Sequence, residues 1–124
     1  MPTRDHIAGF VKMVEAGQYI EAMEAFYADD VTAQENNDEP RVGLQTLLAH
    51  ERRTLETAGR AKARCVSPPI IDGDTVVLHW EFLFPSPNGK PMRLEELVLQ
   101  TWRGDKLASE RFFYDPRQLR PAPT

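Results

Sequence analysis

The sequence has one cysteine and three histidines, and this shortage excludes several classes of site. The single cysteine, Cys65, cannot form an intrachain disulfide and cannot build a thiolate metal cluster. His6, His50 and His79 lie on different predicted elements and lack the spacing of metal ligands. We therefore expect no metal and no other cofactor, and we expect the three histidines at the surface or at an interface.

The sequence also lacks a long apolar run and an excess of positive charge. Every apolar stretch is interrupted within a few residues, so none could span a bilayer, and no membrane partner is expected. Residues 1–6 are polar and lack the apolar core of a secretory signal, so a cytoplasmic location is expected. The net charge is −4 with both signs interspersed, so we expect no nucleic-acid partner.

The composition that is present fits one globular domain. The 124 residues are 41% hydrophobic and 27% charged, which is ordinary for a folded chain that buries a core. We place this domain at residues 1–115. Residues 116–124 contain three prolines and little apolar material, so they are predicted to form a loosely ordered tail.

Three amphipathic helices are predicted before residue 60, because apolar residues recur there at the spacing of one helical face. Gly17 ends the first helix, the second ends near Asp29-Asp30, and Gly59 ends the third. The apolar faces consist of Ile7, Phe10, Val11 and Val14, then Ile20, Met23, Phe26 and Tyr27, then Leu44, Leu47, Leu48 and Leu55.

From residue 61 the apolar pattern changes to a period of two, which predicts strands. Pro68-Pro69 bends or breaks the first of them, because proline cannot donate to a strand ladder. Helices that precede such strands predict an α+β fold with the helices on one face of a mainly antiparallel sheet. The predicted strands are 31–36, 61–71, 75–84, 92–103 and 106–114, with tight turns at Asp72-Gly73, Asn88-Gly89 and Gly104-Asp105.

The predicted strand 92–103 has polar residues on both faces. Burying Glu96 and Gln100 in a dry core without partners would cost several kcal/mol. A cavity with converging polar groups removes this conflict, so we expect one face to line a pocket and the other to support a subunit interface. The first face consists of Leu94, Glu96, Val98, Gln100 and Trp102, and the second of Arg93, Glu95, Leu97, Leu99 and Thr101.

Three segments resemble known families. Residues 27–32, Glu35 and residues 40–43 resemble the helix-to-strand corner of the SnoaL-like and ketosteroid isomerase families. Residues 96–106 and 110–115 resemble the last two strands of SnoaL-like domains. The order of elements matches over about residues 4–115. The resemblance implies a nuclear transport factor 2 (NTF2)-like cone, with a conical pocket between helices and a curved sheet, and a homodimer formed through the outer sheet face.

The resemblance also implies roles for single residues. Glu35 falls where ketosteroid isomerase-like enzymes place the carboxylate that removes a proton beside a carbonyl. Phe10 stands at the position of their tyrosine donor and cannot donate. Gln100 stands at the position of their protonated aspartate and offers an amide donor to the developing oxyanion. The family register turns Arg111 and Phe113 toward the pocket, where Arg111 either forms a structural salt bridge or holds an acidic ligand.

Other candidates follow from the strand faces. Trp80 and Phe82 share an apolar face as pocket wall or core, Tyr27 is either core or a donor, and Trp102 near the strand end would close one rim. The catalytic candidates are Glu35, Gln100 and Arg111, and the substrate-binding candidates are Phe10, Tyr27, Trp80, Phe82, Glu96, Val98, Trp102 and Phe113.

Two classes of function remain open. The first is an isomerase, cyclase or dehydratase that uses carboxylate acid/base chemistry, without a cofactor, on a small hydrophobic or carbonyl-containing molecule. The second is a non-catalytic ligand-binding or dimerisation module. A pocket filled by its own side chains, with Glu35 in a salt bridge, would favour the second.

Overall fold

The computed structural model describes residues 1–86 and 89–119. The turn predicted at Asn88-Gly89 includes residue 88, which lies outside the described residues. The same holds for residues 120–124 of the predicted tail.

Three helices form one layer, as the sequence predicted: α1 (Arg4–Glu15), α2 (Tyr19–Phe26) and α3 (Leu44–Ala58). Gly17 and Gly59 follow α1 and α3 at φ +78° and +80°, a conformation that favours glycine at a helix end. Helix α2 ends earlier than predicted, because Tyr27 is already extended and begins a strand. No helix in the described part of the chain is long and apolar enough to cross a membrane.

The second layer is one curved sheet with the strand order β2-β1-β7-β6-β5-β3, and β4 also pairs with β5. All pairings are antiparallel except that of β1 with β7, which is parallel. The break predicted at Pro68-Pro69 separates β3 from β4. The strands are β1 (Tyr27–Glu35), β2 (Arg41–Val42), β3 (Lys62–Cys65), β4 (Ile70–Asp72), β5 (Thr75–Phe84), β6 (Met92–Arg103) and β7 (Lys106–Phe113).

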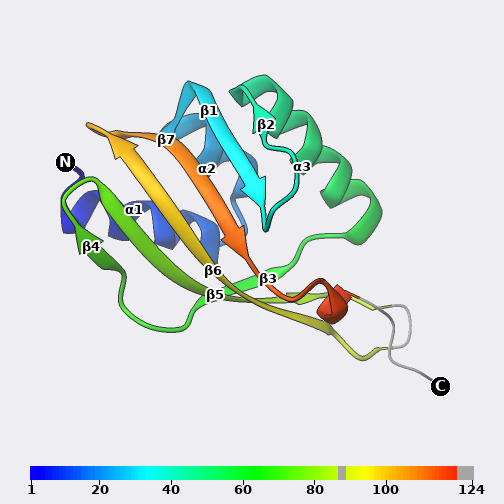
Figure 1. The fold of residues 1–124 in the computed structure, drawn as a ribbon. Coiled ribbons are helices and arrows are strands. Elements are labelled where there is room, and N and C mark those ends of the chain that lie inside the picture. The colour runs from blue at the N-terminus through cyan, green and yellow to red at the C-terminus, as the bar shows by residue number, and fades with distance from the viewer. Residues whose placement is uncertain (87–88, 120–124) are drawn as a thin grey trace.

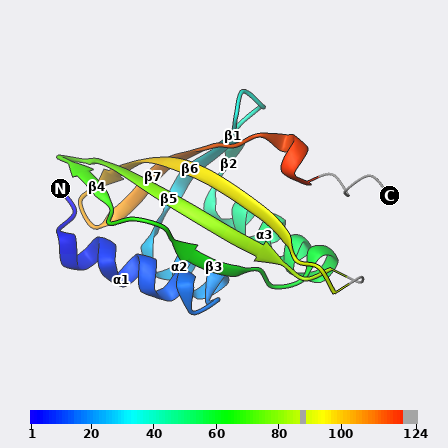
Figure 2. The ribbon, with the colours of Figure 1, turned by 90° about the horizontal axis from the view of Figure 1, so that it is seen from below.

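The helices cover one face of the sheet and leave the other face open (Figure 1 and Figure 2). The core lies between the two layers, where Ile7 of α1, Leu78 of β5 and Leu107 of β7 are fully buried. This arrangement confirms the predicted α+β cone.

A bulge in β7 reverses the faces that the sequence predicted for its second half. Trp102 pairs with Leu107, but the next residue of β6, Thr101, pairs with Ser109, so Ala108 is an extra residue without a partner. A shift of one residue moves every following side chain to the opposite face. The prediction that Ser109, Arg111 and Phe113 face the pocket is therefore wrong. Asp115, the fourth residue of the predicted face, lies beyond the end of β7. Glu110 and Phe112 face it instead.

The beginning of the predicted loose tail is ordered. Pro116–Leu119 form a short 3₁₀ helix, η1. The Gln118 side-chain amide accepts a hydrogen bond from the Glu95 backbone N–H at 2.9 Å and donates one to the Glu95 carbonyl at 3.0 Å. Because the pairing of β7 with β6 ends at Leu97, this amide replaces a strand partner beyond the end of β7.

Candidate functional site

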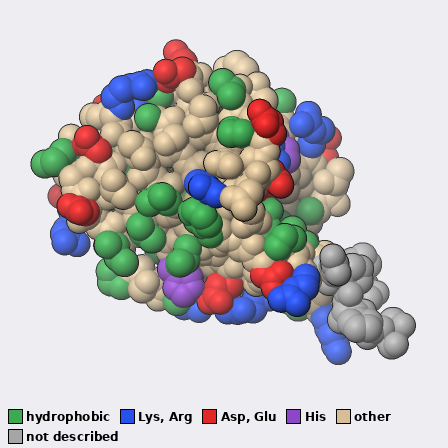
Figure 3. Space-filling view, in the orientation of Figure 1, with side chains coloured by type: hydrophobic (Ala, Val, Ile, Leu, Met, Phe, Trp, Pro, Cys, Tyr) green, Lys and Arg blue, Asp and Glu red, His purple; other side chains and the backbone are tan. Residues whose placement is uncertain are grey.

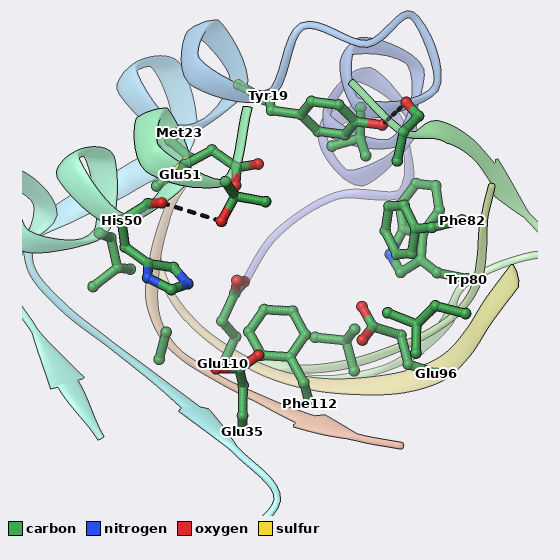
Figure 4. A pocket seen from close by; sticks show the side chains of 18 of the residues that line it. Tyr19, Met23, Glu35, His50, Glu51, Trp80, Phe82, Glu96, Glu110 and Phe112 are labelled. Carbon is green, nitrogen blue, oxygen red and sulfur yellow. Dashed lines mark hydrogen bonds between the residues drawn. The ribbon is translucent and has the colours of Figure 1, made fainter. Parts of the chain in front are cut away.

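A cavity of about 250 Å³ lies between the concave sheet face and the helices. Figure 4 shows side chains pointing into it from the helical layer on one side and from the sheet on the other. Most of the predicted site residues meet here. Those that line the cavity are Phe10, Tyr27, Glu35, Trp80, Phe82, Glu96, Val98 and Gln100.

Aromatic rings form one wall of the cavity. Trp80 and Phe82 lie two residues apart on β5, so both face inward, and their ring centroids are 5.6 Å apart in a stacked arrangement. Phe112 of β7 adds a third ring. Such a wall favours the apolar body of a small ligand.

The Glu96 carboxyl lies in this apolar setting without a partner. Glu96 is 7% exposed, and its carboxyl forms no hydrogen bond within the described part of the chain. It points into the cavity beside Trp80 (Figure 4). Burial, assisted by the charges of Glu110 and Glu35, raises the pKa of Glu96 to about 8. The group is therefore protonated at neutral pH and able to donate a hydrogen bond.

Glu110 lies at the centre of a buried hydrogen-bond network. The Tyr27 hydroxyl donates to it at 2.7 Å, and the Gln100 amide donates at 3.5 Å. The Gln100 carbonyl in turn accepts from the Trp102 indole at 3.1 Å. Burial raises the pKa of Glu110 to about 7, although the bonds from Tyr27 and Gln100 oppose this shift. The Gln100 amide, expected to serve a ligand oxyanion, is thus engaged within the protein.

Glu35 lies in a different electrostatic setting. Arg41 pairs with its carboxylate at 2.5 Å, and the Tyr114 hydroxyl donates to it at 2.9 Å. Burial alone would raise its pKa, but these two hydrogen bonds and the guanidinium charge outweigh burial and lower the pKa of Glu35. Glu35 is therefore an ionised carboxylate at the cavity. Its salt bridge with Arg41 is the one expected of a non-catalytic binding module, but the cavity is open and not filled by its own side chains.

Three predicted residues lie outside the cavity lining. Trp102 is 1% exposed and packs in the core against Phe10 and Phe26, with centroid distances of 6.0 and 6.3 Å, so it closes no rim. Arg111 lies on the outer face, where its guanidinium covers the Phe113 ring at 4.7 Å. The bulge at Ala108 places both Arg111 and Phe113 on the outer face of the sheet.

Comparison with protein families supplies the identity. The model of the SnoaL-like domain matches residues 7–110, most of the chain. The chain belongs to the SnoaL-like domain family. A comparison with curated proteins finds no match.

Solved structures share the fold of this SnoaL-like domain. A protein of Mesorhizobium loti provisionally assigned as a SnoaL-like polyketide cyclase aligns with a TM-score of 0.75 at 22% identity, covering 92% of this chain and all of that one. A protein of Jannaschia sp. with the same assignment aligns at 0.77 and 12% identity, covering 92% and 88%. An NTF2-like protein of unknown function from Cytophaga hutchinsonii aligns at 0.72 and 11%, covering 89% and 96%.

The SnoaL-like pocket contains residues that the sequence analysis missed. Glu51 and His50 of α3 both line it, although His50 was expected at a surface or interface. Burial raises the pKa of Glu51 to about 7, and burial together with the charge of Arg41 lowers the pKa of His50. Glu51 follows Leu47 by four residues, so its place on the apolar helix face was a readable signal.

Within residues 1–86 and 89–119, no cluster of three or more His, Cys, Asp or Glu side chains could hold a metal ion.

The buried carboxyl of Glu96 predicts an unusual dependence of stability on pH. An unfolded glutamate loses its proton near its ordinary pKa of 4.5, whereas native Glu96 keeps its proton up to about 8. Between these values unfolding releases a proton, so the free energy of unfolding decreases as the pH rises. In urea titrations between about pH 5 and pH 8, Glu96→Gln should remove on the order of 1 kcal/mol or more of this decrease.

The matched control is Glu95→Gln, on the same strand but facing solvent. The free energy of unfolding of this variant should decrease with pH as steeply as that of the wild-type chain. Equal slopes for Glu96→Gln and the unchanged chain would contradict a raised pKa at Glu96, whatever the absolute stability of the variant.

Proposed function

We propose that this SnoaL-like domain binds a small, largely apolar carbonyl compound and catalyses an isomerisation, cyclisation or dehydration by acid/base chemistry without a cofactor. The observation that carries the proposal is the unpartnered, buried Glu96 carboxyl that points into an open aromatic cavity. No fully enclosed side-chain oxygen or nitrogen of the described residues lacks a hydrogen-bond partner, so the Glu96 carboxyl oxygens are accessible from the cavity and a ligand there can bond to them.

Glu96 and Glu35 fit opposite roles. Their environments push the two pKa values apart, Glu96 upward and Glu35 downward, and the charge of Glu35 contributes to the upward shift at Glu96. Two carboxyls separated in this way form an acid and a base that work at the same pH.

The proposed reaction begins with the removal of a proton beside the ligand carbonyl. The Glu35 carboxylate accepts a proton from the carbon beside the ligand carbonyl, and the electron pair of that C–H bond moves toward the carbonyl oxygen. Glu96 donates its hydrogen bond, and then its proton, to this oxygen as the enol forms. In an isomerisation, protonated Glu35 returns its proton to the far carbon of a conjugated enol, and the enol hydroxyl returns its proton to Glu96 as the carbonyl re-forms. In a dehydration, protonated Glu35 gives its proton to a hydroxyl on the next carbon, whose C–O bond breaks to release water while the enol hydroxyl returns its proton to Glu96. In a cyclisation, the enol carbon forms a bond to a second carbonyl carbon of the same molecule, the oxygen of that carbonyl takes the proton from Glu35, and the enol hydroxyl returns its proton to Glu96.

The non-catalytic alternative keeps one supporting observation. Arg41 already pairs with Glu35, which makes this carboxylate a weaker base than a free one. A pocket that only binds ligands would tolerate this pairing, so the experiment must separate binding from proton abstraction.

Proton abstraction can be measured directly. A thermal-shift screen of cyclic ketones and aryl ketones identifies a bound compound, since a ligand at 100 times its Kd adds about 2.7 kcal/mol. Deuterium incorporation beside the carbonyl of that compound is then followed by NMR in D₂O. We expect Glu35→Gln and Glu96→Gln each to lower the exchange rate about 10²-fold or more, and Glu95→Gln to leave it unchanged.

The pH profile adds a second readout. Exchange by the unchanged chain should decline above about pH 8, as Glu96 ionises, and this decline should be absent in Glu96→Gln. A ketone that binds but exchanges no faster than in buffer would establish the non-catalytic alternative instead.

We also propose that the chain forms a homodimer through the outer sheet face. Leu97, Leu99 and Phe113 are 48%, 40% and 41% exposed there, and Leu97 and Phe113 are direct neighbours across β6 and β7. Figure 3 shows hydrophobic side chains gathered over this face. A second copy presents the same apolar patch, as a twofold interface requires.

Light scattering after size exclusion tests the dimer. The expected mass is twice the 14.1 kDa of the chain, and Leu99→Lys should shift the population to the monomer, because it places a charge in the apolar patch. Val42→Lys on β2, at a valine that is 63% exposed outside this patch, is the control and should remain dimeric. A monomeric unchanged chain would contradict the proposal.

A further inference from the structure

The cavity contains more acidic than basic groups. Four glutamates line it from four different elements, whereas Arg41 is the single arginine or lysine among the described lining residues and is already paired with Glu35. His50 adds no positive charge to the cavity at neutral pH, because its pKa is lowered and the ring is neutral. The four glutamates are Glu35 of β1, Glu51 of α3, Glu96 of β6 and Glu110 of β7.

We infer that the ligand carries a basic nitrogen, and that Glu51 and Glu110 hold it as an ammonium group between the helical layer and the sheet. This inference rests on the proposed function, because both place the ligand in the same cavity. It adds the chemical class of the ligand, which the acid/base roles of Glu35 and Glu96 leave open.

Glu51 and Glu110 approach the cavity from opposite sides. Figure 4 shows Glu51 on the helical side and Glu110 on the sheet side. The Glu51 carboxyl forms no hydrogen bond or ion pair with any other described residue, and its charge raises the pKa of Glu110. A cation between the two carboxylates removes their mutual repulsion and supplies the partner that the Glu51 carboxyl lacks, while Glu110 keeps its hydrogen bonds from Tyr27 and Gln100.

A second observation points to a ligand independently of this pair. The Glu96 side chain is only 7% exposed, its carboxyl has no hydrogen-bond partner among the described residues, and it points into the same cavity. The stacked Trp80 and Phe82 complete the site, because aromatic faces attract organic cations as well as apolar groups.

The charged and titratable neighbours of the two carboxyls set the pH dependence. Around Glu51 these are Tyr19, Tyr27 and Arg60, and the Arg60 guanidinium only partly offsets the burial of Glu51, while it also donates to the Gly17 carbonyl. Glu110 faces Tyr27, Gln100, Glu51 and Glu96.

Ammonium binding requires ionised carboxylates, whereas a neutral ligand held by protonated carboxyls does not. Because the pKa values of Glu51 and Glu110 are both raised to about 7, amine affinity should increase as the pH rises through that value. The affinity of a neutral hydrogen-bond acceptor held by Glu96 should decrease as Glu96 ionises near 8.

Calorimetry with two isosteric probes tests the inference. We expect 2-phenylethylamine to bind about 10-fold or more tighter than 2-phenylethanol at about pH 8, and the amine affinity to fall about 10-fold between about pH 8 and pH 6. At about pH 6, amine binding should release protons, seen as a heat that changes with the ionisation enthalpy of the buffer.

Variants locate the ammonium site. Glu51→Gln and Glu110→Gln should each weaken amine binding about 10-fold while both still bind the alcohol. Glu56→Gln, at an exposed glutamate of the same helix, is the matched control and should leave amine binding unchanged. If Glu110→Gln fails to fold, because Tyr27 loses its partner, the Glu51→Gln result decides alone.

Three outcomes would overturn the inference: no amine binding at millimolar concentration, equal affinity for the amine and the alcohol, or an amine affinity that Glu51→Gln does not change. The deuterium exchange of a bound ketone measures the proposed function separately. Failure of amine binding leaves that rate unaffected, and absence of exchange leaves the amine affinity unaffected.

Discussion

Strand β6 is paired with β5 along most of its length and with β7 along its second half, and this double pairing determines which side chains reach the cavity. Its inward residues include Glu96, Val98 and Gln100. Their neighbours across the sheet, Trp80 on β5 and Glu110 on β7, face the same way because paired residues share a face. The acidic and aromatic character of the pocket therefore follows from one register.

The bulge at Ala108 fixes that register on the β7 side. Without it, Arg111 would stand opposite Val98 and enter the pocket, and Glu110 would face solvent. The excess of acidic over basic groups in the cavity would then fall from four against one to three against two, because a guanidinium would replace the Glu110 carboxyl. One inserted residue thus accounts for most of the acidic excess of the pocket.

Glu35 and Glu96 show how the same side chain acquires opposite properties. Arg41 and Tyr114 surround Glu35 with hydrogen-bond donors and hold it ionised, whereas Glu96 lies against apolar groups and remains protonated. The cavity shape comes from the fold, which many proteins share. The division of the carboxyls into one ionised and one protonated group comes from particular residues of this chain.

Much of the fold was predictable from local pattern. The alternation of apolar residues gave the bounds of β5 and β6, and glycines marked the ends of α1 and α3. Glu96 was predicted to face the cavity because two polar residues on an otherwise apolar strand face conflict with a dry core.

The rest depends on pairing between distant segments, which local pattern does not encode. The parallel pairing of β1 with β7 and the bulge in β7 involve residues far apart in the chain, and the bulge made the predicted places of Arg111 and Phe113 wrong. The pairing of Arg41 with Glu35 could not be read from spacing. Glu51 was within reach of the sequence, as an acidic residue on the apolar face of a helix.

The most direct test of this account is the titration of the Glu96 carboxyl by NMR, with ¹³C-labelled glutamate and with Glu96→Gln to assign its resonance. The account predicts a midpoint near 8, well above the ordinary value of 4.5. A midpoint near 4.5 would show that Glu96 is ionised and solvated at neutral pH. The acid of the proposed reaction would then be absent from the pocket.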